Sequence, residues 1–451
     1  MILYVGFYFL RKNNSKEDYY VGGRDISAGH VGVSIAATDV GGGFSIGLGG
    51  LGFTMGLAGS WLLFTGLVGA WMAAVLTVPR LKKLDINSGL LTYPDFLSLK
   101  YNKSVGTIAA VISSLGYLGF TAGQILAGGK LAAGSIFSEI TWTNPLLFSL
   151  IVMAFVVVAY TALGGLKAVI YTDTIQWIVL LAGLMFMGVP FAYYKLGGWE
   201  TIVNSLPESH FNLMNIKGVT LINWAFSIIP IWFIAMTLYQ RVYATRSVKQ
   251  AKKAFFIAGF FEYPLMAFSG VVLGMLAKVA FPESDPETAL PLLLTHVLPV
   301  GVAGFVLAAY FSAVMSTADS CLIAASGNVE NDILKTSKEN RNRNLVKRSI
   351  LITVIIGVLA FLLATWFTSV LSIVLQSYSF MVSGLLVPTL IAYFSRKPNP
   401  TAAIVSMIGG GGLTLFLIFL TIELPYGLEP TIFGICTSAL LYYITYKLVK
   451  K

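Results

Sequence analysis

The chain has 451 residues, of which 56% are hydrophobic and only 11% are charged, and its mean hydropathy is +0.79. A soluble domain carries about 25% charged residues, so this composition excludes an ordinary soluble protein. The formal net charge of +10 does not indicate nucleic-acid binding, because the lysines and arginines gather in short loops on one side of the predicted topology. This asymmetry predicts an inner or plasma membrane protein that has a cytoplasmic C-terminus, contacts the lipid bilayer and has no nucleic-acid partner.

Long apolar runs recur along the chain, and most are long enough to cross about 30 Å of hydrocarbon. Backbone polar groups must be paired within lipid, and no alternating barrel pattern is present, so these runs predict helices. We expect an all-α polytopic membrane protein with about 13 transmembrane helices. The run at 1–10 is too short to span alone, and the others lie near 29–55, 57–78, 105–137, 144–163, 168–196, 219–239, 251–281, 298–333, 348–367, 368–394, 401–420 and 431–448.

The order of these runs predicts a four-part organisation. The runs between 29 and 394 divide into five plus five, and an odd number per group gives the two groups opposite orientations in the membrane. The expected parts are a partial N-terminal helix with a cytoplasmic loop, a first five-helix repeat, an inverted second repeat and two C-terminal helices, over 1–28, 29–196, 219–394 and 395–451. The symmetry is inferred from topology and not from a residue-level repeat.

The first run of this core is unusually rich in glycine. Residues 36–50 read AATDVGGGFSIGLGG, and each glycine costs a helix roughly 1 kcal/mol relative to alanine. Close helix packing is one explanation, because small residues are common at contacts between membrane helices. The other is an unwound stretch whose carbonyls and amides face a site at the membrane midplane. Asp39 in the same stretch favours the second explanation, because a charged side chain within a membrane usually marks a site.

A later run contains the stretch AVMSTADS at 313–320. Helical spacing places four of its positions on one face, namely Ala313, Ser316, Thr317 and Ser320. Hydroxyls close to a free carbonyl suit a hard cation, which prefers oxygen ligands. Hydroxyls also bond back to carbonyls one turn earlier, and this alternative stays open for Ser316 and Thr317. It does not explain Asp319.

A third carboxylate, Asp173, lies in GGLKAVIYTDTIQW near the cytoplasmic start of its run. Solvent or Lys167 is an alternative partner for it, but three carboxylates near or inside apolar runs indicate cation handling. Paired aspartates on separate helices also occur in intramembrane aspartyl proteases. Neither Asp173 nor Asp319 stands in the Gly-x-Gly-Asp motif of those enzymes, so we expect a protein that is not an enzyme.

Several of these stretches resemble one known family. EDYYVGGRDIS followed by SIAATDVGGGFSIGLGG resembles the first helical region of the sodium:solute symporter family. TALGGLKAVIYTDTIQ and GFVLAAYFSAVMSTADSCLIAASGNVENDI resemble two further stretches of it, and the second is the most specific match. The resemblance extends roughly over 18–394. It implies the inverted five-helix-repeat fold of leucine-transporter-like proteins, with discontinuous first and sixth core helices.

The resemblance also implies where sodium binds. The implied ligands, between the first and eighth core helices, are the carbonyls of Ala37, Val40 and Ala313 and the hydroxyls of Ser316 and Thr317. Asp39 matches an acidic position that is important for sodium in proline-transporting members. Some members bind a second sodium, and the positions that match its site are Asp173, Ser316, Asp319 and Ser320. Because Asp319 stands where the family has a serine, we expect one bound sodium ion and leave open whether a second one binds.

The substrate is expected beside the sodium site, between the first, third, sixth and tenth core helices. The candidate residues by position are Thr38, Gly42, Tyr117, Phe120, Gln124, Trp232, Gln376 and Tyr378. Aromatic residues at helical spacing are often packing residues, whereas the Gln376 amide is costly in hydrocarbon without a partner. Gln376 also looks like a glutamine that contacts sugar in galactose-transporting members.

The expected function is sodium-coupled import of a small polar solute by alternating access, with an amino acid such as proline as the best candidate. The first core helix lacks the polar set of sugar-transporting members, and no arginine stands in the third-helix region to bind a strong acid. Symport of a sugar or an organic acid remains an alternative. A proton-coupled transporter of the same fold is another, since the three aspartates can carry protons but the Ser316/Thr317 pair would then have no role.

Overall fold

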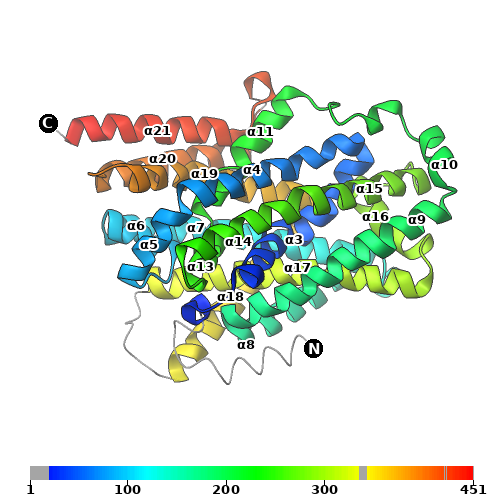
Figure 1. Ribbon diagram of the computed structural model, residues 1–451, viewed down its shortest axis with the longest axis horizontal. Coiled ribbons are helices and arrows are strands. Elements are labelled where there is room, and N and C mark those ends of the chain that lie inside the picture. Colours follow the sequence, from blue (N-terminus) through cyan, green and yellow to red (C-terminus); the bar gives the residue numbers. More distant parts are fainter. Residues whose placement is uncertain (1–19, 335–342, 421, 423, 450–451) are drawn as a thin grey trace.

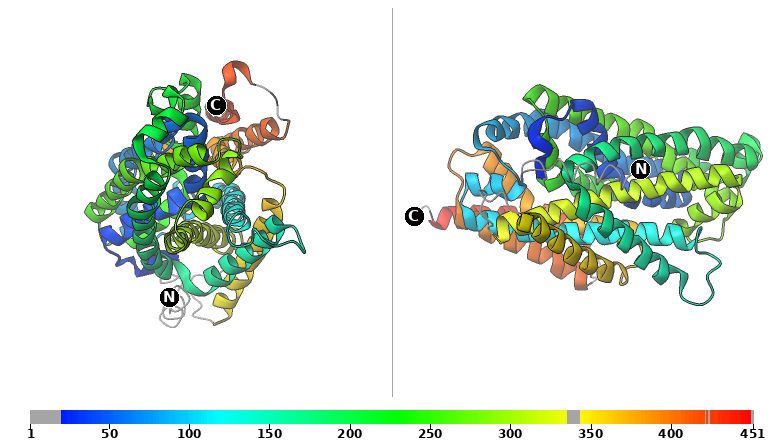
Figure 2. Two further views of the ribbon diagram at one scale, coloured as in Figure 1. Left: turned by 90° about the vertical axis from the view of Figure 1, so that its right-hand side faces the viewer. Right: turned by 90° about the horizontal axis from the view of Figure 1, so that it is seen from below.

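The computed structural model describes residues 20–334, 343–420, 422 and 424–449, which fold into a bundle of helices (Figures 1 and 2). The first half contains η1 (Gly22–Arg24), α3 (Ala28–Met55), η2 (Gly56–Ser60), α4 (Trp61–Leu76), α5 (Val78–Ser88), α6 (Tyr93–Lys100), α7 (Lys103–Ala133), α8 (Pro145–Leu181), η3 (Ala182–Gly188) and α9 (Val189–Lys195). The second half contains α10 (Gly198–Ser205), η4 (Glu208–Phe211), α11 (Gly218–Ile228), α12 (Ile231–Ile234), α13 (Met236–Ala244), α14 (Val248–Phe260), η5 (Phe261–Ala267), α15 (Phe268–Ala280), α16 (Pro286–His296), α17 (Val300–Asn328), η6 (Val329–Ile333), α18 (Arg343–Ala364), α19 (Val370–Phe394), α20 (Pro400–Leu420), η7 (Pro425–Gly427) and α21 (Pro430–Val449).

The helices run along the longest axis of the molecule, with α9, α10 and α16 at one end and α5 and α6 at the other (Figure 1). In the described part of the chain, nine spans are long and apolar enough to cross a membrane, or ten when the bent pair Gly218–Ile234 and Met236–Ala244 counts as one. The predicted all-helical membrane architecture is therefore confirmed, whereas the count of about 13 helices is not. The predicted partial helix at 1–10 lies outside the described residues.

Polar side chains begin several of the apolar helices. The side-chain oxygen of Asn102 accepts from the Val105 amide at 3.0 Å, and that of Asn144 accepts from the Leu146 amide at 2.9 Å. Each cap satisfies a backbone donor that has no partner inside the helix. The long apolar runs that follow need no further signal, because a helix is the conformation that pairs their backbone groups within lipid.

Two helices of the core are interrupted, as the sequence predicts. In α3 the backbone of Gly41 has φ 46° and ψ −173°, a conformation that is nearly restricted to glycine. Between α12 and α13 the backbone of Ala235 is extended, and the chain bends by 42°. Helix α17 packs against α3, α7 and α8, so its middle faces the α3 interruption (Figure 1).

Ion pairs tie the helices together at both ends of the bundle. At one end Lys130 on α7 bonds Glu287 on α16 at 2.6 Å, and Glu287 also accepts the Val370 amide at the start of α19. At the other end Lys82 on α5 bonds Asp85 at 2.8 Å and the Tyr243 carbonyl of α13 at 3.0 Å. Burial lowers the pKa of Lys82, although the adjacent Asp85 carboxylate opposes this shift.

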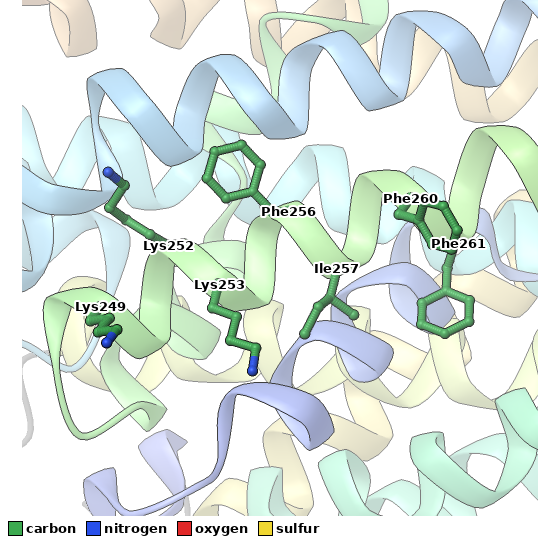
Figure 3. A pocket seen from close by; sticks show the side chains of 7 residues that line it. All are labelled: Lys249, Lys252, Lys253, Phe256, Ile257, Phe260 and Phe261. Carbon is green, nitrogen blue, oxygen red and sulfur yellow. The ribbon is translucent and has the colours of Figure 1, made fainter.

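The outer face of helix α14 carries a groove with lysines at one end and phenylalanines along the rest. This groove is lined by three lysines followed by four apolar residues, namely Lys249, Lys252, Lys253, Phe256, Ile257, Phe260 and Phe261 (Figure 3). Lysines at the end of a span, followed by phenylalanines along it, fit the boundary between the cytoplasm and the hydrocarbon. The residue that follows this groove, Glu262, is completely buried.

Candidate ion and substrate site

The interruption of α3 is in direct contact with α17. The Thr317 hydroxyl donates to the Ala37 carbonyl at 3.1 Å, and a Cβ on Gly41 would lie only 2.1 Å from the Thr317 oxygen. The five predicted sodium ligands all come from these two facing stretches, with Ala37 and Val40 on α3 and the other three on α17. Carbonyl and hydroxyl oxygens are the ligands that a hard cation prefers, so the donor chemistry of this junction fits sodium.

Arg241 on α13 is completely buried and forms the centre of a polar cluster inside the bundle. Its guanidinium donates to the hydroxyls of Thr38 at 2.6 Å, Ser320 at 2.8 Å and Ser34 at 3.1 Å. It also forms an ion pair with Asp173 at 3.2 Å. We call these five residues the Arg241 cluster. A guanidinium stays charged in proteins, so the cluster contains a permanent cation.

Both carboxylate oxygens of Asp173 have partners, in this cluster and on the adjacent Ser316. One carboxylate oxygen accepts the Ser316 hydroxyl at 2.6 Å, and the other accepts the Ser34 hydroxyl and the Arg241 guanidinium. The structure therefore brings Asp173, Ser316 and Ser320 together, as the hypothesis of a second sodium requires. It also brings Arg241 to the same place, so the carboxylate already faces a positive charge.

The fourth residue of that hypothetical second site, Asp319, is less well satisfied. Its Oδ1 accepts the Ser320 hydroxyl at 3.4 Å, and its Oδ2 has no partner among the described residues. The Asp319 side chain is completely buried on α17. Asp319 thus adds a second carboxylate beside Asp173 without a cation of its own.

A small pocket lies between the α3 interruption and the α12–α13 bend. Four of the predicted substrate residues line it, namely Thr38, Tyr117, Phe120 and Tyr378, together with Asp39, Ile231, Ala235, Thr237, Leu238 and Cys321. The Phe120 and Tyr378 rings stack at a centroid distance of 5.0 Å and an angle of 10°. The pocket has room for about one water molecule, so a larger solute enters only when the surrounding helices separate.

The other four predicted substrate residues are not part of this lining as the described residues form it. The Trp232 ring packs against Gly69 of α4 and against the Phe255 ring, with centroids 5.9 Å apart. The Gln376 amide donates to the Ser372 hydroxyl one turn earlier at 3.0 Å. Gly42 lies against Val314, and Gln124 is buried within α7. Trp232 and Gly42 therefore make packing contacts between helices, as aromatic and small residues often do in a helical bundle.

Asp39 and Glu262 place a second pair of carboxylates inside the bundle, and we call them the Asp39–Glu262 pair. Asp39 Oδ1 accepts the Tyr378 hydroxyl at 3.3 Å, whereas Asp39 Oδ2 and both oxygens of Glu262 have no hydrogen-bond partner among the described residues. A Cβ on Gly66 would lie 2.7 Å from Glu262 Oε2 and 3.9 Å from Asp39 Oδ2. Both carboxylates therefore face the same glycine of α4.

The sequence interpretation missed Arg241 and Glu262. Arg241 is the second residue after the apolar run that we ended at Tyr239, so its charge counted with the cytoplasmic loop, whereas it is buried on α13. Glu262 lies in the middle of the run 251–281, where a lone carboxylate is itself a signal of a site. Reading every acidic residue within an apolar run would have found it.

Comparisons with known proteins show to which family the chain is similar. The model of the sodium:solute symporter family matches residues 19–410. A sodium/glucose cotransporter of Vibrio parahaemolyticus is 28% identical over 94% of this chain and 84% of its own length, and a high-affinity proline transporter of Bacillus subtilis is 26% identical over 92% and 89%. A solved sodium-coupled sialic acid symporter, in a substrate-bound outward-open state, has the same fold, with a TM-score of 0.79, 21% identity and coverage of 99% and 95%.

Proposed function

Because the chain belongs to the sodium:solute symporter family, we propose that it imports a small zwitterion, such as an amino acid of the size of proline, by alternating access. It is a multi-pass membrane protein of a transporter family, and sodium is its coupling ion. The observation that carries the proposal is the pocket beside the α3–α17 junction, which combines a carboxylate with two stacked aromatic rings. Alternating access then exposes this pocket first to the outside and then to the cytoplasm.

Sodium is proposed to bind at the α3–α17 junction, through the carbonyls of Ala37, Val40 and Ala313 and the hydroxyls of Ser316 and Thr317. The 3.1 Å contact between the Thr317 hydroxyl and the Ala37 carbonyl supports this assignment, because it brings two oxygen ligands together. Asp39 lies between this junction and the pocket. Sodium at this junction stabilises the arrangement of α3 and α17 that forms the pocket, and linkage requires substrate to favour sodium by the same factor.

The buried guanidinium of Arg241 supports a stoichiometry of one sodium. It occupies the position of a cation toward Asp173 and Ser320, the residues on which a second sodium would depend. A sodium ion next to a fixed guanidinium would meet like-charge repulsion in a medium of low dielectric constant. We therefore propose that Arg241 is the fixed cation of this region and that the exchangeable sodium ion binds at the α3–α17 junction.

The three candidate classes of substrate, organic acids, sugars and zwitterions, differ in the charge that they carry into the pocket. An organic acid brings a negative charge next to the Asp39 carboxylate without an ammonium group to offset it, and the only arginine near the pocket in the described part of the chain is engaged by Asp173. A sugar needs several hydrogen-bonding groups, whereas much of the pocket is lined by Phe120, Ile231 and Leu238. A zwitterion matches both the carboxylate of Asp39 and the apolar wall.

Sodium-dependent thermal stabilisation tests the proposal. We would measure the melting temperature of the purified protein in sodium or potassium chloride across a panel of amino acids, sugars and organic acids, and repeat it with Thr317→Ala. The matched control is Thr161→Ala, because the Thr161 hydroxyl is buried and donates to the Val157 carbonyl one turn earlier. We expect an amino acid to stabilise the wild type and the control in sodium only, and Thr317→Ala to lose at least about 1 kcal/mol of this effect.

Three results would contradict the proposal in different ways. Equal stabilisation in potassium, with a dependence on pH, would replace sodium coupling by proton coupling. Stabilisation by a sugar or an organic acid alone would retain sodium symport and reject the zwitterion. An unchanged sodium response in Thr317→Ala would reject the assigned ligands.

A further inference from the structure

The Asp39–Glu262 pair consists of carboxylates that lack a fixed counter-charge. Glu262 is completely buried, Asp39 is 7% exposed, and three of their four oxygens have no hydrogen-bond partner among the described residues. None of the ion pairs between described residues includes either one. A buried charge without a partner is strongly unfavourable, so a group that binds here gains by supplying the missing positive charge.

The backbone around Glu262 favours a position inside the bundle. Residues Phe261–Ala267 form a π-helical turn that contains Pro264, and the proline removes one backbone donor from the helix. Such turns shift the direction of the side chains that follow and are frequent at functional sites. Gly66 lies across from this turn, and because it has no side chain both carboxylates can approach this part of α4 closely.

The neighbouring pocket indicates which kind of cation fits. Asp39 is part of its lining, and Tyr378 both donates to Asp39 and stacks on Phe120. Aromatic faces attract organic cations, and Ile231 and Leu238 offer contact for a hydrocarbon group. A metal ion would use none of these apolar contacts. The surroundings therefore favour a cation that is attached to carbon.

We infer that Asp39 and Glu262 together bind the ammonium group of the transported solute. This inference rests on the proposed function and names the part of the solute that the chain recognises. Asp39 contacts the ammonium group from the pocket, and Glu262 adds a second negative charge behind Gly66. The hydrocarbon portion of the solute then lies against the Phe120 and Tyr378 rings.

Three probes that share one ring but keep or lose the ammonium and carboxylate groups separately test the inference. Proline, the pyrrolidinium ion and tetrahydro-2-furoate share one ring size, and the last has an ether oxygen in place of the ammonium nitrogen. We would measure the apparent affinity of each probe from thermal shifts in sodium chloride, for the wild type and for Glu262→Gln. Proline and pyrrolidinium are expected to bind the wild type, and tetrahydro-2-furoate is not. Glu262→Gln is expected to weaken the two ammonium probes about ten-fold or more.

Two further variants separate recognition from folding. Gly66→Ala keeps both charges but places a methyl group beside Glu262 Oε2, and we expect it to weaken the ammonium probes as well. Glu429→Gln removes a half-buried carboxyl near the start of α21, which accepts the Ser227 hydroxyl at 3.3 Å, and we expect no change in affinity. The sodium concentration that half-stabilises each variant without any probe is expected to stay within about two-fold of the wild type.

The outcomes distinguish this inference from the proposed function. Sodium-dependent binding of glucose or of tetrahydro-2-furoate, without binding of an ammonium probe, overturns the inference but leaves sodium symport intact. A Glu262→Gln variant that binds proline and pyrrolidinium like the wild type also overturns it. If Glu262→Gln changes the sodium response without any probe, the pair is an ion site and the inference is wrong. The absence of any sodium-dependent ligand overturns both.

Discussion

The Arg241 cluster and the Asp39–Glu262 pair both place carboxylates inside the membrane, but they are neutralised in different ways. In the first, Asp173 faces a guanidinium that the chain itself provides, and hydroxyl groups satisfy its remaining oxygens. In the second, the oxygens that face Gly66 have no partner among the described residues. The fixed guanidinium in the first region holds helices together. The carboxylates in the second region, unpaired among the described residues, can be neutralised only when a cation binds.

The two regions are also neighbours along α3. Thr38 belongs to the Arg241 cluster through its hydroxyl, and Asp39, the next residue, belongs to the pair. Successive residues of a helix point about 100° apart, so one turn of α3 contributes to both regions. A movement of this turn would therefore change the surroundings of both regions at once.

Removal of the permanent charge should have the largest effect. Arg241→Ala leaves Asp173 buried without its cation, and breaking a buried ion pair costs about 3–5 kcal/mol. We expect a strongly lowered melting temperature and a loss of transport. The double variant Arg241→Ala/Asp173→Asn should recover much of the stability, because it replaces both members of the ion pair by neutral side chains. Added sodium should also stabilise the single variant more than the wild type, because the ion can then approach Asp173.

The double variant is the critical control for this prediction. If the single and double variants melt at the same temperature, the guanidinium acts through its other hydrogen bonds and the pairing with Asp173 is incidental. Thermal unfolding that is followed by tryptophan fluorescence, at several sodium concentrations, measures all three proteins under the same conditions.

A methyl group at the α3 interruption should have the next largest effect. Gly41→Ala adds about 1–3 kcal/mol of backbone strain, and its Cβ would overlap the Thr317 hydroxyl. We expect the sodium-dependent rise in melting temperature to disappear, because the added methyl group forces α3 and α17 apart at the proposed sodium site. Gly301→Ala on α17 is the matched control, since a Cβ there has no neighbour within 4 Å. A normal sodium response in Gly41→Ala would show that the junction is not an ion site.

The smallest effect concerns a pH response that belongs to neither region. Burial lowers the pKa of His210, in η4, below its ordinary value of 6.5, and the Lys278 ammonium adds to this shift. The folded protein thus binds this proton less tightly than the unfolded chain. Above about pH 6.5 the imidazole is neutral in both states, and His210 does not lower the free energy of unfolding. As the pH falls below that value toward the lower pKa of the folded state, the free energy of unfolding decreases.

His210→Gln isolates that response, because the glutamine amide can still donate to the Phe53 carbonyl that His210 contacts at 3.1 Å. The melting temperature of the wild type should fall more steeply than that of the variant between pH 7 and pH 5, and the two should run parallel above pH 7. Identical slopes throughout would assign the pH dependence to other groups. Either way, the measurement provides a baseline for pH effects on the buried carboxylates.

Much of the fold could be predicted from the sequence because membrane helices leave simple signals. Apolar length and the loop positions of lysine and arginine indicate spans and orientation, and the glycines at 41–43 indicate the interruption of α3. The pairing of that interruption with Ser316 and Thr317 came from the family resemblance. The contact between Thr317 and Ala37 now supplies a physical reason for it.

The charged interior could not be predicted in the same way. Whether Arg241 points to the cytoplasm or into the bundle depends on the bend at Ala235 and on which neighbours offer acceptors, and neither is visible in the spacing of apolar residues. The same limitation applies to Trp232. Its ring packs against Gly69, and the sequence could not tell a packing residue from one that lines a pocket.

The two helix interruptions also differ in how freely mutation can alter them. At Gly41 the backbone angle and the nearby Thr317 exclude any side chain, whereas Ala235 has φ −68° and ψ 119°, which any residue adopts. During divergence, the second interruption can therefore accept new side chains beside the pocket while the first stays fixed. A saturation library should tolerate several small side chains at 235 and only glycine at 41, so new transport specificities should be sought at Ala235.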